Sequence, residues 1–263
     1  MAICKLCKVE KQLIKKSHII PEFLYKELYD EKHQMLKFDA IEKAKGIDKI
    51  SKPPKGEYES ELLCRECDGN RLGKYESYLG KIISNTKLPK EQTPNCEKII
   101  NETGVEFLRI ENIDYKLLKL CLLTILWRAS ISQRPTYKNV SLGPYEEKIR
   151  KQLFEENPSS DMDIAIVVMS WRNDTNTATD IIAQPKRHRD NSKTYYSIIL
   201  NGYIVLFFIS ENSINKELEF FRLKEDNTIS IIYLEKGTGM NFLLSYTSAK
   251  DEINRKFNIK LKK

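Results

Sequence analysis

The most apolar stretch of the chain predicts one long, buried helix. Asp114 is a typical N-cap residue at its start, and apolar side chains cover most of its circumference as far as Ser130. These apolar positions are Leu117, Leu118, Leu120, Cys121, Leu122, Ile125, Leu126 and Trp127. A helix of this kind lies inside a domain. We therefore expect Arg128, near its end, to pair with a carboxylate, with Glu76 as one candidate, or to line a cleft that faces phosphate.

Shorter helices are predicted on the N-terminal side and after this helix. Leu72, Tyr75, Leu79 and Ile82 or Ile83 recur with the period of one helix face, which predicts a helix after Cys67. Prolines at first helical turns predict helices over residues 22–29 and 144–154. Residues 33–58 contain glycine and proline without a clear period, which indicates a loop or an insertion.

From Asp163 onward the pattern changes to short runs rich in Ile, Val, Tyr and Phe, separated by turn residues. The predicted strands are residues 164–171, 180–184, 195–201, 203–210 and 228–234. Asn201-Gly202 between two apolar runs predicts a hairpin. The chain is therefore expected to be α+β, with central helices at about residues 114–154 and a mainly antiparallel C-terminal sheet at about residues 163–235.

The polar residues 86–104 contain two prolines and a glycine, which predicts a boundary between a domain at 1–86 and a domain at 105–263. The net charge of +7 is compatible with a polyanionic partner. A high lysine content can also reflect the background base composition of the coding DNA, so the charge alone does not identify a partner. No apolar run is long enough to span a bilayer, so no membrane role is expected. The first sixteen residues carry lysines and no apolar run, so we expect a cytoplasmic protein. Residues 254–263 are expected to be a loose basic tail or a helix end that could contact phosphate.

Two Cys-x-x-Cys pairs, Cys4 with Cys7 and Cys64 with Cys67, are the strongest chemical signal. Each pair has the spacing that places two thiolates on one tetrahedral zinc ion, and four thiolates close such a site. The ion would then be structural. Disulfides are the alternative, but a reducing cytoplasm favours metal binding. Because residues 8–63 separate the pairs, other structure must bring them together.

The order of these motifs resembles a known family. Cys4-x-x-Cys7, Ser17-His18-Ile19-Ile20-Pro21 and Leu62-Leu63-Cys64-x-x-Cys67-Asp68 before a helix resemble the zinc-knuckle branch of the HNH, or ββα-metal, nucleases, over about residues 1–85. Residues 126–130 and 140–144 are similar to bacterial HNH endonuclease-like proteins, some of them encoded near phage-defence genes. The resemblance implies an N-terminal ββα-metal-like module, a catalytic Mg²⁺ or Mn²⁺, and cleavage of nucleic acid, with DNA the expected substrate.

By this resemblance His18 matches the general base, and the four cysteines match the structural zinc ligands. Asp68 stands where the family has the final His or Asn ligand of the catalytic cation, and a carboxylate suits that cation. Glu76 could be a second ligand. The sequence departs from the family at Ser17, where many members have an acidic ligand, and at Glu59 and Glu61, where the family has an asparagine before the second knuckle.

Each catalytic candidate also has a structural interpretation. His18 could be a buried histidine satisfied by a backbone carbonyl, or a zinc ligand. Asp68 could be a helix N-cap, and Glu76 could accept from Arg71, Lys74 or Arg128. The residues expected to follow a nucleic-acid backbone without reading its sequence are Lys15, Lys16, Arg65 and Arg128.

Three classes of function remain open. The first is a metal-dependent endonuclease in bacterial defence. The second is a noncatalytic, zinc-stabilised module that binds nucleic acid or protein through an altered HNH centre. The third is a sensor whose C-terminal domain binds a regulatory ligand or a partner and gates the nuclease. Self-association is compatible with all three.

Overall fold

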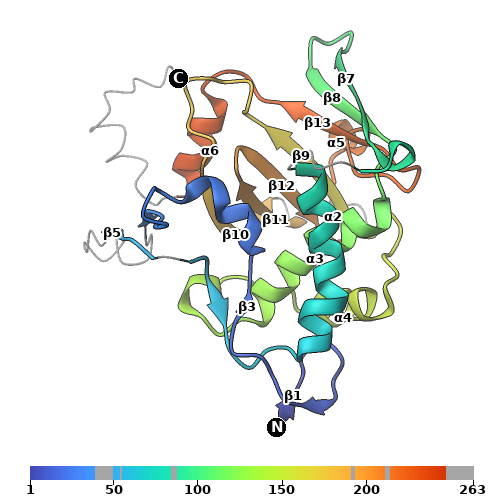
Figure 1. Cartoon of the computed structure of the whole chain (residues 1–263). Helices are drawn as coiled ribbons and strands as arrows, with labels where there is room; N and C mark the ends of the chain where they lie inside the picture. The colour runs from blue at the N-terminus through green and yellow to red at the C-terminus, as the bar shows by residue number, and fades with distance from the viewer. Residues whose placement is uncertain (39–49, 54, 84–87, 191–192, 211–213, 247–263) are drawn as a thin grey trace.

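The computed structural model describes residues 1–263 except 39–49, 54, 84–87, 191–192, 211–213 and 247–263. Its centre is a seven-stranded sheet in the order β10-β11-β12-β9-β13-β8-β7 (Figure 1). Neighbouring strands are antiparallel except β13 and β9, which are parallel. The strands are β7 (Asn95–Ile100), β8 (Glu106–Glu111), β9 (Ala165–Ser170), β10 (Ile182–Asp190), β11 (Lys193–Leu200), β12 (Tyr203–Phe208) and β13 (Ile229–Tyr233). The α+β class with a mainly antiparallel sheet is confirmed.

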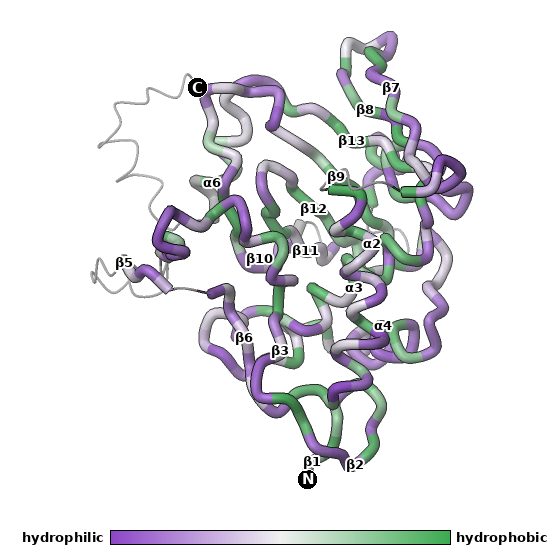
Figure 2. Tube along the Cα trace, in the orientation of Figure 1, coloured by the Kyte–Doolittle hydropathy of each residue, from purple (hydrophilic) through white to green (hydrophobic). Residues whose placement is uncertain are grey.

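The two faces of the sheet pack against different parts of the chain. Along β12, Val205 and Phe207 face the core that holds the central helix α3, while Ile204, Leu206 and Phe208 face a second core. The second core is closed by residues of the later chain, including Phe221 and, in part, Phe242 of helix α6 (Thr238–Tyr246). The hydropathy colouring in Figure 2 follows this arrangement, with apolar colour along the central strands. The alternation along the strands therefore separates two cores.

The central helix α3 (Tyr115–Ile131) confirms the prediction from the apolar run. Oδ1 of Asp114 accepts from the N–H of Leu117 at 2.8 Å, so Asp114 is the N-cap. The helix also buries Lys119, whose Nζ donates to the hydroxyl of Tyr115 at 3.0 Å and to two backbone carbonyls. Burial lowers the pKa of Lys119 to about 8. These bonds satisfy a lysine inside an otherwise apolar helix.

Helix α4 (Pro144–Glu155) and the hairpin at Asn201-Gly202 also match the predictions. Asn201 and Gly202 have φ angles of 49° and 84°, the left-handed pair that a tight hairpin requires. A Cβ on Gly202 would meet Cγ of Arg172 at 2.7 Å, so the turn needs glycine for space as well.

The stretch expected as a domain boundary contains a strand. Residues 95–111 form the β7–β8 hairpin at one end of the sheet, and β7 is mostly exposed, so it carries no burial pattern that a sequence could reveal. Strand β10 also extends to Asp190, beyond the predicted 180–184. One continuous hydrophobic core includes Cys4 and Leu63 of the N-terminal part together with Leu126 of α3. The two parts of the chain therefore share a core.

Within residues 33–58, β4 (Lys37–Phe38) pairs with β5 (Ile50–Ser51), while residues 39–49 and 54 lie outside the described part. The predicted tail at 254–263 also lies outside it. Among the helices that the structure describes, none combines the length and apolar character needed to cross a membrane.

Candidate functional site

The first cysteine pair lies in a tight turn between two short strands. Strand β1 (Ala2–Ile3) pairs with β2 (Glu10–Lys11), and the N–H of Cys4 donates to the carbonyl of Val9 at 3.0 Å. Lys8 has a positive φ of 60°, which turns the chain back after Cys7. The two thiols therefore project from one side of this turn.

Backbone hydrogen bonds bring the second pair to the first across the long sequence gap. The N–H of Lys5 donates to the carbonyl of Leu62, and that of Ile14 donates to Leu63, both at 2.9 Å. Arg150 of α4 also donates to the carbonyl of Leu6 in the first turn. The expectation that other structure joins the two pairs is thus met by main-chain pairing, supported from the side by α4.

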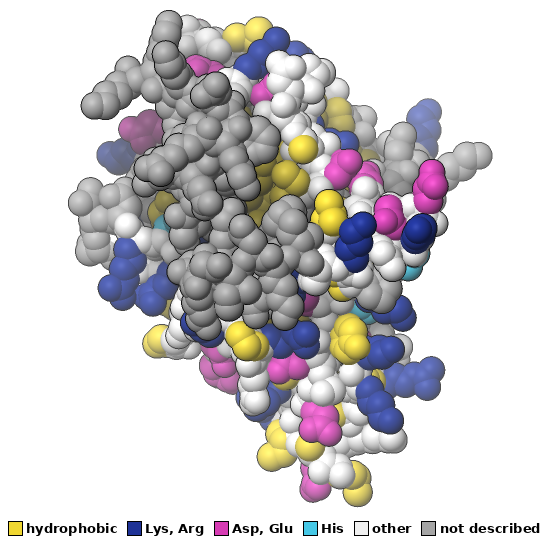
Figure 3. Space-filling model, turned by 90° about the vertical axis from the view of Figure 1, so that its left-hand side faces the viewer, with side chains coloured by type: hydrophobic (Ala, Val, Ile, Leu, Met, Phe, Trp, Pro, Cys, Tyr) yellow, Lys and Arg dark blue, Asp and Glu magenta, His cyan; other side chains and the backbone are white. Residues whose placement is uncertain are grey.

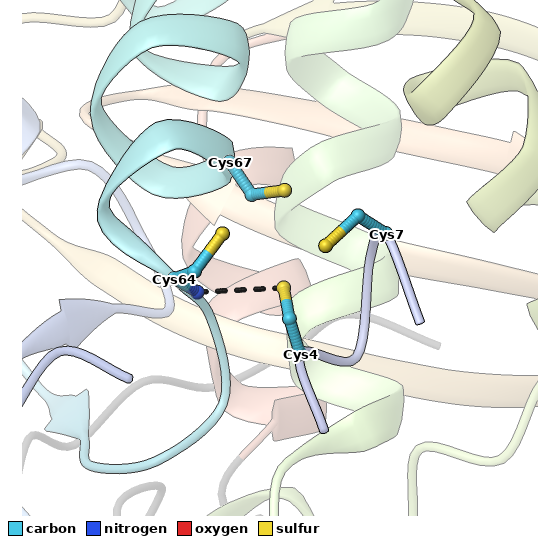
Figure 4. A group of neighbouring side chains, drawn as sticks. All are labelled: Cys4, Cys7, Cys64 and Cys67. Carbon is cyan, nitrogen blue, oxygen red and sulfur yellow. Dashed lines mark hydrogen bonds between the residues drawn. The ribbon is translucent and has the colours of Figure 1, made fainter. Parts of the chain in front are cut away.

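The four thiols converge on one point (Figure 4). The Sγ atoms of Cys4, Cys7, Cys64 and Cys67 all lie within 4.8 Å of one another, and none of the cysteines is in a disulfide. The Cys67 thiol donates toward Cys4 and lowers the pKa of Cys4 to about 4, whereas that contact raises the pKa of Cys67. The thiols therefore do not ionise together by themselves. A divalent cation removes this conflict, so the group could hold a metal ion.

Directly after Cys64 the chain forms a wide helical turn. Residues Glu66–Leu72 are a π-helix, which continues as α2 (Gly73–Ile83). Because Arg65 is the cap residue and the N–H of Asp68 already bonds the carbonyl of Cys64, Asp68 lies within the first turn. The interpretation of Asp68 as the N-cap is therefore wrong.

A pair of short strands brings His18 to this helix. Strand β3 (Ser17–His18) pairs with β6 (Tyr58–Glu59), so that His18 lies opposite Tyr58. Ser17 is fully buried, and its Oγ donates to Oδ1 of Asp68 at 2.7 Å. Ser17, which stands where the family often has an acidic residue, is therefore the direct link between the strand and the helix.

His18 faces a carboxylate that the sequence analysis did not single out. Its Nε2 lies 2.9 Å from Oε2 of Glu22, in the 3₁₀-helix Glu22–Leu28. The two atoms are at hydrogen-bonding distance without hydrogen-bonding alignment, and neither has another partner among the described residues. The hydroxyl of Tyr29 donates to the other oxygen of Glu22. His18 therefore meets neither a backbone carbonyl nor the cysteine group in the interactions that the structure describes.

The environment of His18 favours its neutral form. Burial lowers its pKa from the usual value, the nearby Arg128 acts in the same direction, and Glu22 and Asp68 oppose the shift. A neutral imidazole at pH 7 has the protonation state that a general base requires. Its side chain keeps 26% exposure, although Nε2 itself is buried.

Arg128 joins the two acidic candidates. Its Nη2 donates to Oδ1 of Asp68 at 2.8 Å and its Nη1 donates to Oε1 of Glu76. The Arg128 side chain is only 2% exposed, and the carboxylates are 21% and 22% exposed. Burial raises the pKa of Glu76, and Arg128 opposes this shift. The expected pairing of Arg128 with Glu76 is confirmed, and its burial leaves no surface for a phosphate in this arrangement.

These contacts bear on the catalytic cation. Asp68 and Glu76 each give one oxygen to the buried guanidinium, which already neutralises one of their two charges. Within the described residues, only the four cysteines bring three or more candidate ligand atoms close together. The acidic residues, as they lie, therefore do not form a site that fits Mg²⁺ or Mn²⁺.

The basic candidates differ in position. Lys15, Lys16 and Arg65 are exposed, and Nζ of Lys16 lies 5.5 Å from the ring centroid of Tyr58. Lys15 and Lys16 directly precede strand β3, so they lie next to His18 in the chain. These three side chains are free to meet a polyanion, unlike Arg128.

Sequence reasoning missed two residues around His18, namely Glu22 and Tyr29. The spacing of four residues between His18 and Glu22 was the available signal, but it indicates a contact only if the chain turns after Pro21. Glu59 has a different role from a metal ligand, because it accepts from the hydroxyl of Ser132 and from the N–H of Gln133.

The chain was compared with models of protein families, with curated proteins and with solved structures. None of the three comparisons found a match.

Proposed function

We propose that this protein is a nucleic-acid endonuclease of the HNH type, with DNA as the expected substrate, and that it acts in bacterial defence. The observation that carries the proposal is that Ser17, the neighbour of His18 on strand β3, donates to Asp68 on the helix after Cys64, which places His18 and Asp68 in one region of the molecule. The order of strand pair, second knuckle and helix agrees with a ββα-metal-like module. Zinc is the ion proposed for the four cysteines, because four thiolates suit its tetrahedral geometry.

In this proposal His18 is the general base. Because Nε2 lies 2.9 Å from Oε2 of Glu22, the other ring nitrogen, Nδ1, is the atom proposed to take a proton from the attacking water. The water oxygen forms the new bond to phosphorus, the bond from phosphorus to the leaving oxygen breaks, and the leaving oxygen takes a proton from solvent water. The exposed Lys15, Lys16 and Arg65 hold the backbone of the substrate.

The divalent cation expected from the family has no step in this scheme. Asp68 and Glu76 are bound to Arg128 and do not fit a cation as they lie. This observation favours a second candidate function, a noncatalytic module that binds nucleic acid or protein through the same fold. Cytoplasmic location, a regulatory ligand or protein partner of the C-terminal sheet, and self-association stay predictions.

A cleavage assay separates the two candidates. Plasmid and single-stranded DNA are incubated with the wild type and with His18→Ala, with Mg²⁺, Mn²⁺ or Ni²⁺ and without added cation. No chelator is used, so the ion bound by the cysteines is retained. We expect the wild type to cleave and His18→Ala to lose at least about a hundredfold in rate, the usual contribution of a general base.

His33→Ala is the control for loss of an imidazole. His33 is exposed and stacks on Tyr29, which donates to Glu22, so its replacement can act on His18 only indirectly and should lower the rate far less than His18→Ala. Both variants are checked for an unchanged melting temperature. Equal cleavage by the wild type and by folded His18→Ala would refute the role of His18. Absence of cleavage under all conditions, with DNA still bound, would leave the noncatalytic module.

A further inference from the structure

The β10–β11 hairpin concentrates positive charge at one end of the sheet. Between residues 182 and 200 it carries Lys186, Arg187, Arg189 and Lys193, with Asp190 as its one acidic residue. Strand β10 is one of the two edge strands of the sheet, and among the described residues its partner in the sheet is β11. Arg187 and Arg189 are exposed. Because they are two residues apart on a strand, they share one face and are separated by about 6.8 Å.

These two arginines differ from most others in the chain. The arginines that hydrogen-bond to a described residue are Arg71, Arg109, Arg128, Arg134, Arg150, Arg172 and Arg222. Among the described residues, Arg187 and Arg189 have no such bond and no ion pair. A guanidinium presents five donors in a fixed plane and matches phosphate oxygens well. Two exposed guanidinium groups on one strand face are therefore available for an external anion.

The face that carries them leads toward the proposed centre. Arg187 lies directly opposite Tyr196 on β11, and the hydroxyl of Tyr196 donates to the carbonyl of Ser141. Strand β10 also contacts the 3₁₀-helix Pro135–Tyr137. Just before this helix, Arg134 donates to the carbonyl of Tyr58 at 2.8 Å. The hairpin is therefore connected, through residues 134–141, to the strand that pairs with His18.

The surface view agrees with an extended distribution of charge. Figure 3 looks at the side that lies to the left in Figure 1, and it shows Lys and Arg side chains near both lateral margins of this face. At the N-terminal module, Lys16 lies over the ring of Tyr58, the residue whose carbonyl binds Arg134. A long polyanion can meet both groups of cations, whereas a small anion can meet only one.

We infer that Arg187 and Arg189 on the edge strand β10 bind the phosphate backbone of the nucleic acid and extend its path beyond the proposed centre. The inference rests on the proposed function for the identity of the partner. Each arginine contacts a separate phosphate, so the surface adds affinity without reading base sequence. The hairpin thereby supplies a second anchor for the strand held beside His18.

Basic side chains on an edge strand can also serve a purpose other than phosphate binding, and the test must distinguish the two. Charged side chains on an edge strand prevent it from pairing with another chain. Glutamates serve that use equally well but repel phosphate. The double variant Arg187→Glu, Arg189→Glu therefore keeps the edge charged but replaces the proposed phosphate contacts by repulsion. Its sedimentation should match that of the parent protein, while its affinity for DNA falls.

The binding test uses the full chain carrying His18→Ala, so that cleavage does not disturb the measurement. Fluorescence anisotropy with a short labelled DNA duplex is recorded between about 50 and 200 mM salt. Replacing Arg187 and Arg189 by glutamine should weaken binding about tenfold or more and reduce the slope of log affinity against log salt by about 2, one per lost phosphate contact.

Arg109→Gln is the matched control. Arg109 is partly exposed on β8, toward the other end of the sheet, and it pairs with Glu111 at 2.8 Å. We expect its affinity and salt slope to equal those of the parent. The glutamine and the glutamate variants of Arg187 and Arg189 could both keep the salt slope of the parent, while neutralising Lys15 and Lys16 still abolishes binding. That result would overturn the proposed role of the β10–β11 hairpin and leave the proposed nuclease intact. A changed slope together with no cleavage by the wild type would support the surface and contradict only catalysis.

Discussion

Replacement of Arg128 by methionine tests the arrangement at the centre of the molecule most directly. Methionine keeps an unbranched apolar side chain in the core but removes the guanidinium that binds Asp68 and Glu76. Loss of one partner from a buried ion pair costs about 3 to 5 kcal/mol, because the remaining charge stays buried and unpaired. The two carboxylates are 21% and 22% exposed, so water hydrates them in part. We therefore expect a loss of about 3 kcal/mol, at the lower end of the range for buried pairs.

This loss should depend on pH. Burial already raises the pKa of Glu76 in the folded protein, and Arg128 opposes the rise. In the variant this opposition is gone, so the folded pKa of Glu76 rises further above its unfolded value. A carboxyl with a raised folded pKa binds more protons in the folded state, so stability is gained as pH falls through that pKa and lost as pH rises. The deficit of the variant relative to the wild type should be largest near pH 7 and smaller near pH 5.

Thermal unfolding followed by circular dichroism at both pH values measures the effect. A loss of about 3 kcal/mol corresponds to a decrease in Tm of about 6 to 12 °C for a chain of this size. Glu76→Gln added to the variant should restore part of the loss at pH 7, because it removes one unpaired charge. Arg109→Met, which breaks a partly exposed pair, should cost less than about 1 kcal/mol. A Tm of Arg128→Met equal to that of the wild type at both pH values would refute the reasoning.

Three further predictions concern the metal, the base and the packing. Purified protein should contain about one equivalent of zinc by metal analysis. The variant Cys64→Ser should lose the zinc and unfold the N-terminal part, which proteolysis would detect. A wild type that contains no metal and has two disulfides by mass spectrometry would contradict this prediction. Glu22→Gln should lower the pKa of His18 further, because Glu22 opposes the shift that burial causes. NMR titration of His18 measures this, with Glu22→Asp as the control that keeps the carboxylate. An unchanged pKa of His18 in Glu22→Gln would exclude the contact. Gly56→Ala should lower the free energy of unfolding by about 1 to 3 kcal/mol, because the new Cβ would lie 2.3 Å from the buried ring of Tyr25. Gly69→Ala is the control: a Cβ there has nothing within 4 Å, so thermal unfolding should show no loss of stability or a gain.

Tertiary structure decided the contacts around the proposed centre. Arg128 was expected to meet one carboxylate or to face a cleft, and it binds both Asp68 and Glu76 while almost fully buried. Glu22 escaped notice because its contact with His18 depends on the path of the chain after Pro21, and Tyr29 because it reaches His18 only through its hydrogen bond to Glu22. Contacts between side chains far apart in the sequence leave no periodic signal, so no local pattern could reveal them.

The sequence by itself determined the elements whose signals are local. The buried helix follows from an apolar run behind Asp114, the hairpin from Asn201-Gly202, and the two thiol pairs from their spacing. Strands β7 and β8 could not be predicted in this way, because β7 is exposed along most of its length and a strand without a buried face lacks the alternation that identifies it. Backbone hydrogen bonds between distant segments decided the place of these strands in the sheet and brought the two cysteine pairs together. Because every residue type except proline offers the same backbone N–H and C=O groups, such bonds leave no signal in the sequence.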